Sequence, residues 1–139
     1  MQTIRITTFL RATLLADAAT CAIMGLLMTL FSTSLSNLMA LPSPLLFYAG
    51  LSLFPFSGFL LYVATRGKTA APLVWAIVVG NALWTLGGIL ILPAGWVTPN
   101  VFGFCFVLLQ SAGVAFLACL ELIGLRRSES EAAPAFQRS

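Results

Sequence analysis

The chain has 139 residues, of which 60% are hydrophobic and only 8% are charged, and its formal net charge is +3. Soluble domains carry about 25% charged residues, so this composition excludes a soluble globular enzyme, and it equally excludes a disordered chain. The mean hydropathy of +1.02 leads to the same conclusion. The sequence predicts one small domain that is embedded in lipid.

Long apolar segments dominate the chain, and they follow one another at residues 13–31, 45–64, 73–92 and 101–125. Each has about the 20 residues that a helix needs to cross a bilayer. Their apolar residues are continuous and do not alternate as in a barrel strand. We therefore predict an all-α membrane protein over residues 1–127, with four transmembrane helices arranged as a bundle of two hairpins. Residues 128–139 are polar, and we predict a disordered tail there.

Proline marks the start of three of these segments. Ser43-Pro44 and Thr98-Pro99 have the pattern of a capping hydroxyl followed by a first helical residue that needs no hydrogen-bond partner. Pro72 fits the same role for the third segment. These residues predict where the second, third and fourth helices begin.

The first connection between segments contains a short amphipathic pattern. Leu35, Leu38 and Met39 are spaced for one face of a helix, and Ser34 could cap it. We therefore predict a short helix that lies in the membrane interface.

The cationic residues all fall on one side of the predicted membrane. They precede the first segment, separate the second from the third, or follow the fourth, whereas the other two connections carry no charge. The positive-inside rule then places both termini in the cytoplasm, in a multi-pass protein of a bacterial cytoplasmic (inner) membrane. Copies of the chain should share one orientation. The seven cations are Arg5, Arg11, Arg66, Lys68, Arg126, Arg127 and Arg138.

Two acidic residues, Asp17 and Glu121, lie inside predicted membrane segments, toward the cytoplasmic side. A charged residue at the centre of a membrane helix costs about 2.5–3.5 kcal/mol on insertion scales, so each acid needs a partner or a cavity. One interpretation is an acid pair that responds to protons or cations at the inner mouth of a cavity. The alternative is that each acid pairs with an arginine such as Arg11, Arg126 or Arg127.

Three further residues are candidates for a ligand or ion pathway. Asn81 and Gln110 lie near the centres of the third and fourth segments, so antiparallel neighbours would bring them to similar depth. They could bond to each other or line a binding site. Trp84 shares the face of Asn81 but lies deeper than an interfacial tryptophan. It could pack in the core or form a pocket wall.

Small residues predict where helices approach closely, because they allow backbones to come together. In the fourth segment they recur at a spacing of four, and glycines in the third segment offer the same contact. Pro55, near the centre of the second segment, removes a backbone hydrogen bond and predicts a kink or hinge. The packing candidates are Gly80, Gly88, Gly113, Ser111, Ala115 and Cys119.

The chain contains no histidine, and none of its three cysteines belongs to a CxxC pair. The usual haem ligand, the commonest zinc ligand and the usual general base are therefore missing. There is no glycine-rich phosphate loop either. We expect no enzyme, no cofactor, no metal site and no nucleic-acid partner, and we interpret the cysteines as small apolar packing residues.

Two functions remain, and the lipid bilayer is the partner in both. The first is a transport or small-ligand-binding module that works as a homo-oligomer of parallel copies. The second is an accessory or assembly subunit of a larger membrane complex with a purely structural role, which the small-residue faces would suit equally well. The pathway of the first would be lined by Asp17, Asn81, Trp84, Gln110 and Glu121.

Overall fold

The computed structural model describes the backbone of residues 2–137 and the side chains of residues 2–132. Four of its five helices are long and apolar enough to cross a membrane, which confirms the four predicted helical segments. The elements in chain order are β1 (Thr3–Arg5), α1 (Thr8–Leu30), α2 (Ser32–Met39), α3 (Ser43–Ala64), β2 (Lys68–Ala70), α4 (Ala71–Ile91) and α5 (Val101–Gln137).

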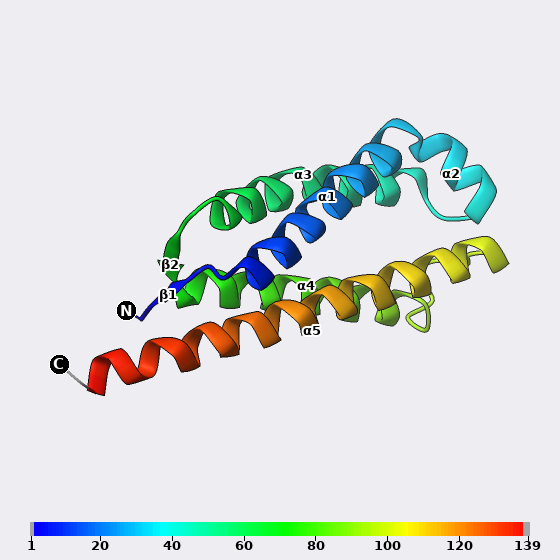
Figure 1. Ribbon diagram of the computed structural model, residues 1–139. Coiled ribbons are helices and arrows are strands. Elements are labelled where there is room, and N and C mark those ends of the chain that lie inside the picture. The colour runs from blue at the N-terminus through cyan, green and yellow to red at the C-terminus, as the bar shows by residue number, and fades with distance from the viewer. Residues whose placement is uncertain (1, 138–139) are drawn as a thin grey trace.

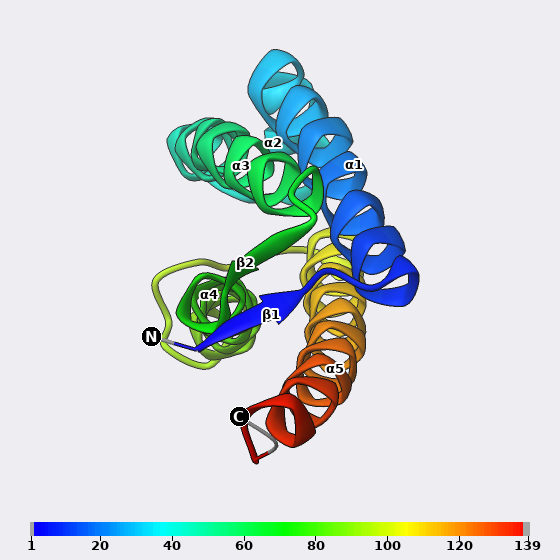
Figure 2. The same cartoon turned by 60° about the vertical axis from the view of Figure 1, so that its left-hand side comes forward.

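The four long helices form two antiparallel pairs. α1 packs along α3, and α4 packs along α5 (Figure 1). The pairs meet mainly where α1 contacts α5, whereas α3 and α4 make little contact with each other. Figure 2 shows this separation, with α4 standing away from α3. The two pairs are therefore joined mainly through α1 and α5.

A two-stranded antiparallel ribbon ties the N-terminal segment to the α3–α4 connection. β1 pairs with β2 so that Ile4 lies opposite Thr69, and the N–H of Ile6 donates to the carbonyl of Gly67 at 3.0 Å. The all-helical prediction missed these strands. We call this end of the molecule the ribbon end, and the opposite end, which carries α2, the α2 end (Figure 1).

Cationic side chains gather at the ribbon end. Arg5 and Lys68 face each other across the ribbon. Arg11 donates to two backbone carbonyls at the end of α3, at 2.9 and 3.1 Å, and it thereby satisfies groups that a helix end leaves free. The cations among the described side chains are Arg5, Arg11, Arg66, Lys68, Arg126 and Arg127, whereas Arg138 lies outside the described residues.

The start of α5 lies beyond the end of α4, next to α2. Asn100 caps α5 in place of the predicted Thr98, because its Oδ1 accepts from the N–H of Gly103 at 3.0 Å. Asn100 also joins α5 to α2, since its Nδ2 donates to the carbonyl of Leu38 at 2.7 Å and its N–H donates to that of Met39 at 3.1 Å.

The other helix starts agree with the sequence in part. Pro44 and Pro72 lie in the first turns of α3 and α4, as predicted. The hydroxyl of Ser43 forms no cap, because Ser43 is already the first helical residue. The short helix predicted in the first connection is confirmed as α2, but it begins at Ser32, so Ser34 does not cap it.

Helix α5 is longer than the predicted fourth segment. It continues to Gln137, through most of the segment for which the sequence predicted a disordered tail. The extension packs against other elements: Ser128 is buried, and Trp75 of α4 donates through Nε1 to Glu129 at 3.2 Å. Residues 128–137 are therefore helical in spite of the polar composition on which the tail prediction was based.

Candidate functional site

Asp17, Asn81 and Glu121 meet in the space between α1, α4 and α5. The Asn81 Nδ2 donates to Asp17 Oδ2 at 2.7 Å and to Glu121 Oε2 at 2.9 Å. All three side chains are buried, with exposed fractions of 1%, 3% and 0%. One amide therefore joins two acids from different helices, and we call this group the carboxyl–amide cluster.

Three of the four carboxyl oxygens in the cluster have a donor. Besides the two bonds from Asn81, the Sγ of Cys21 donates to Asp17 Oδ1 at 3.5 Å. The remaining oxygen, Glu121 Oε1, is buried and has no hydrogen-bond partner among the described residues. A buried polar atom without a partner costs about 1–3 kcal/mol, so Glu121 is the least satisfied member of the cluster.

Arginine does not balance these carboxyl groups. Arg11 donates to backbone carbonyls at the end of α3, and Arg127 lies over the ring of Phe9, 5.4 Å from its centroid. Among residues 2–132, the side chains that donate to these two carboxyl groups are Asn81 and Cys21. The two acids thus have neutral partners, and the predicted pairing with Arg11 is not formed.

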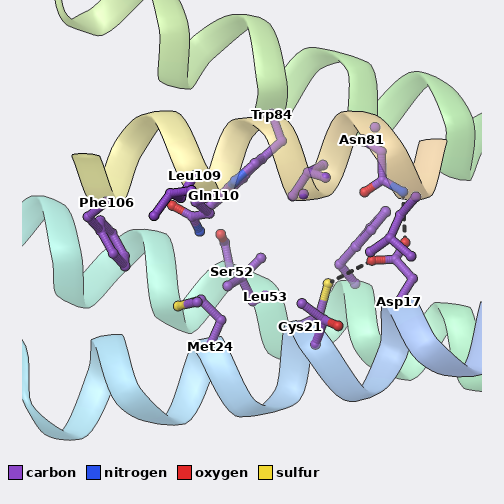
Figure 3. A pocket seen from close by; sticks show the side chains of 16 residues that line it. Asp17, Cys21, Met24, Ser52, Leu53, Asn81, Trp84, Phe106, Leu109 and Gln110 are labelled. Atoms are coloured by element: carbon purple, nitrogen blue, oxygen red, sulfur yellow. Dashed lines mark hydrogen bonds between the residues drawn. The ribbon is translucent and has the colours of Figure 1, made fainter. Parts of the chain in front are cut away.

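A cavity of about 630 Å³ lies beside the cluster, between the two helix pairs. All four long helices contribute to its wall. Figure 3 shows Asp17 and Asn81 at one end and Phe106, with Leu109 and Gln110, toward the other. Pockets that bind small organic molecules measure about 300–1,000 Å³, so the cavity has the size of a ligand site.

The wall between the two ends is mostly apolar and partly aromatic. Met24 comes from α1, Phe56 from α3 and Trp84 from α4. On α1 the lining extends from Asp17 to Met24, which corresponds to about 10 Å along the helix axis. The cavity is therefore elongated, with an acidic group at the cluster end, a mostly apolar body, and the amide of Gln110 toward the other end.

The structure brings four of the five predicted pathway residues to this cavity, namely Asp17, Asn81, Trp84 and Gln110. Glu121 lies behind Asn81 and outside the lining. The predicted contact between Asn81 and Gln110 is not formed, because Gln110 Nε2 instead contacts the Sδ of Met28 at 3.9 Å. Since α5 starts beyond the end of α4, Glu121 lies level with Asn81 and Gln110 lies nearer the α2 end.

Two of the predicted packing glycines contact neighbouring helices. A Cβ added to Gly88 would collide with Ser111, which is buried, so these residues hold α4 close to α5. A Cβ added to Gly80 would lie 3.1 Å from the ring of Phe56. Gly80 therefore provides one of the few approaches between α4 and α3.

The other packing candidates show no such close approach in the part of the chain that the structure describes. Gly113 lines the cavity, and a Cβ there would have nothing within 4 Å. Ala115 is half-buried and Cys119 is exposed. A role for these residues in contacts with other chains stays a prediction.

Helix α3 is continuous across Pro55. Two residues later, Ser57 is buried, and its hydroxyl donates to the carbonyl of Ala18 in α1 at 2.8 Å. This bond ties α3 to α1 next to the proline. The hinge role of Pro55 stays a prediction.

Cys21 and Phe56 are among the contributors to the site that sequence reasoning missed. Cys21 binds Asp17, and its position one helical turn further along the same face is a signal that could have revealed it. Phe56 lines the cavity from α3, and no local sequence pattern predicts a contact of this kind.

No protein-family model, no curated protein and no solved structure matches the chain. The cavity and the carboxyl–amide cluster are therefore the observations from which a function can be argued.

Proposed function

We propose that the chain is a multi-pass membrane protein that binds a small, mostly apolar molecule in the cavity between its helix pairs, as the binding site of a small transport module. Four helices are long and apolar enough to cross a membrane. Their outer faces expose large apolar side chains such as Leu30, Leu83 and Phe116, at 70%, 64% and 64%. Such surfaces are favourable in lipid and costly in water.

The elongated, mostly apolar cavity with a buried acid at one end is the observation that carries this proposal. Ligand sites combine apolar walls with a few polar groups that orient the ligand, and here Asp17 and Asn81 provide those groups. Buried acidic groups are expensive within a membrane. A purely structural subunit would need neither the acids nor the empty space, so ligand binding accounts for more of the structure.

We further propose that the ribbon end faces the cytoplasm. The six described cations lie at this end, and the α2 end has none among the described residues. Positive charge next to membrane helices is retained in the cytoplasm. Copies of the chain would then share one orientation, so a homo-oligomer would be parallel.

Thiol labelling in whole cells tests this orientation. In a background in which Cys21, Cys105 and Cys119 are replaced by serine, Asn37→Cys at the α2 end should react with a membrane-impermeant maleimide. Lys68→Cys at the ribbon end should react only after the cells are permeabilised. The reverse pattern would contradict the orientation, and labelling of both sites from outside would contradict the four-span topology.

Filling the cavity tests the ligand site. Gly113→Leu should weaken binding of the apolar dye N-phenyl-1-naphthylamine at least tenfold in lipid nanodiscs, because Gly113 lines the cavity and has free space for a side chain. Binding is measured by energy transfer from Trp84, with Trp75 and Trp96 replaced by phenylalanine. Gly87→Leu is the matched control, since Gly87 also has open space but does not line the cavity.

The two leucine variants separate cavity binding from partition into lipid. Equal dye binding by Gly113→Leu and Gly87→Leu would show that the dye lies elsewhere, and the proposal would be wrong. No saturable dye binding in the unsubstituted cavity, together with a second membrane protein that copurifies in fixed ratio, would favour the accessory-subunit alternative.

A further inference from the structure

Resting on the proposed function, we propose that the ligand is a monovalent organic cation with an elongated apolar body, and that its positive charge pairs with Asp17. The charge of the carboxyl–amide cluster and the shape of the cavity beside it both point to this class of ligand. Asp17 is the acid that faces the ligand, because it lines the cavity and Glu121 does not.

The cluster has no positive charge of its own. Asn81 and Cys21 are neutral donors, and Arg11 is engaged by the end of α3. The sequence of α4 contains no titratable residue, and the two tyrosines of α3, Tyr48 and Tyr62, are exposed on its outer face. A carboxylate away from water is stabilised by a paired cation, so an entering positive group would be held at this end of the cavity.

Helix α5 does not provide that positive group either. Its first arginines after the cluster are Arg126, which is exposed, and Arg127, which lies against Phe9. The acid Glu129 of the same helix accepts from Trp75. Among the described side chains, the charge that would balance the cluster is therefore missing from every helix that surrounds it.

The two acids of the cluster are placed differently. Asp17 lines the cavity, and both of its carboxyl oxygens accept a hydrogen bond. Glu121 bonds to Asn81, does not line the cavity, and leaves one buried oxygen without a hydrogen-bond partner among the described residues. Two negative charges this close and away from water repel each other strongly. The geometry thus favours Asp17, the acid that lines the cavity, as the counter-ion of the ligand.

The rest of the cavity suits the body of such a ligand. Phe56, Trp84 and Phe106 contribute aromatic rings to the wall, and aromatic faces attract both apolar groups and organic cations. The lining extends about 10 Å from Asp17 along α1. A metal ion fits less well, because no group of three His, Cys, Asp or Glu residues that could hold one occurs within the described part of the chain.

Competition between two probes of the same shape tests the charge of the ligand. The first is (3-phenylpropyl)trimethylammonium, and the second is its neutral isostere with carbon in place of nitrogen. In nanodiscs of zwitterionic lipid, the cation should displace N-phenyl-1-naphthylamine at a concentration at least tenfold lower than the isostere. Asp17→Asn should abolish this preference, because it removes the counter-ion while its amide oxygen can still accept from Asn81.

Two further variants locate the charge. Glu129→Gln removes an acid of α5 that lies outside the cavity, so the preference for the cation should remain. Glu121→Gln separates the two acids of the cluster: the preference persists if Asp17 is the counter-ion, and its loss would overturn the assignment to Asp17.

The outcomes also separate this inference from the proposed function. Equal displacement by both probes would overturn the cationic ligand, while saturable dye binding would still support a ligand cavity. Absence of dye binding would contradict the proposed function itself. If Asp17→Asn did not fold, the comparison of the two probes on the unsubstituted protein would still decide the question.

Discussion

Replacing Asn81 with leucine should lower the free energy of unfolding by about 3 kcal/mol or more. Asn81 is the shared donor to Asp17 and Glu121, and each carboxyl group that loses its donor while buried costs about 1–3 kcal/mol. Polar contacts between membrane helices average only about 0.6 kcal/mol, but here two carboxyl groups lose a donor at once. Titration with sodium dodecyl sulfate in mixed micelles, followed by circular dichroism, measures this free energy.

A second background shows whether the loss arises from the acids. When Asp17→Asn and Glu121→Gln are already present, Asn81→Leu should cost only about 1 kcal/mol, because the remaining amides can bond to each other. Leucine shares the branched shape of asparagine, and the change in packing that it causes is common to both backgrounds, so it cancels in the comparison. Equal costs in both backgrounds would mean that Asn81 stabilises the fold by packing alone, contrary to the hydrogen bonds described.

Hydropathy was sufficient to locate the four long helices, because an apolar run of membrane length has few structural alternatives. α3 and α4 begin and end within one turn of the predicted segments. α1 begins earlier than predicted, since Thr7 caps it through a bond from the N–H of Leu10 at 3.2 Å. A cap of this kind lies before the apolar segment, so hydropathy alone does not detect the start of the helix.

The ribbon and the extension of α5 could not be predicted in the same way. β1 and β2 have three residues each and pair over a long separation in sequence, so neither strand shows a local alternating pattern. Residues 128–131 of α5 are polar in sequence, and the contacts of this segment, such as the burial of Ser128 and the bond to Glu129, are tertiary. The structure of both regions depends on tertiary contacts, which composition does not reveal.

The sequence identified four of the residues that line the cavity but not their hydrogen-bond partners. Counting from the centres of the apolar segments placed Asn81 level with Gln110, whereas the structure places it level with Glu121. Composition defines the centre of each segment. The alignment of α5 along α4, however, depends on the path of the connection between them. Here the connection runs outward until Asn100 binds α2, and this shifts α5 along α4.

Gly50→Leu should lower the free energy of unfolding by about 3 kcal/mol, the upper end of the usual cost of overpacking. Even a Cβ at Gly50 would lie 2.7 Å from the Cβ of Met28 and 3.0 Å from the backbone nitrogen of Thr29. On the facing helix, a Cβ at Gly25 would lie 3.0 Å from the carbonyl oxygen of Gly50. Because backbone atoms block the space, α1 and α3 would have to separate.

Gly58→Leu on the same helix is the matched control for this effect. A Cβ at Gly58 would have nothing within 4 Å, and replacing a helical glycine with leucine is favourable by up to about 1 kcal/mol. The two variants add the same side chain to α3, so the same detergent titration isolates the contact with α1. If Gly50→Leu unfolded at the same point as Gly58→Leu, the glycines would not be what brings α1 and α3 together.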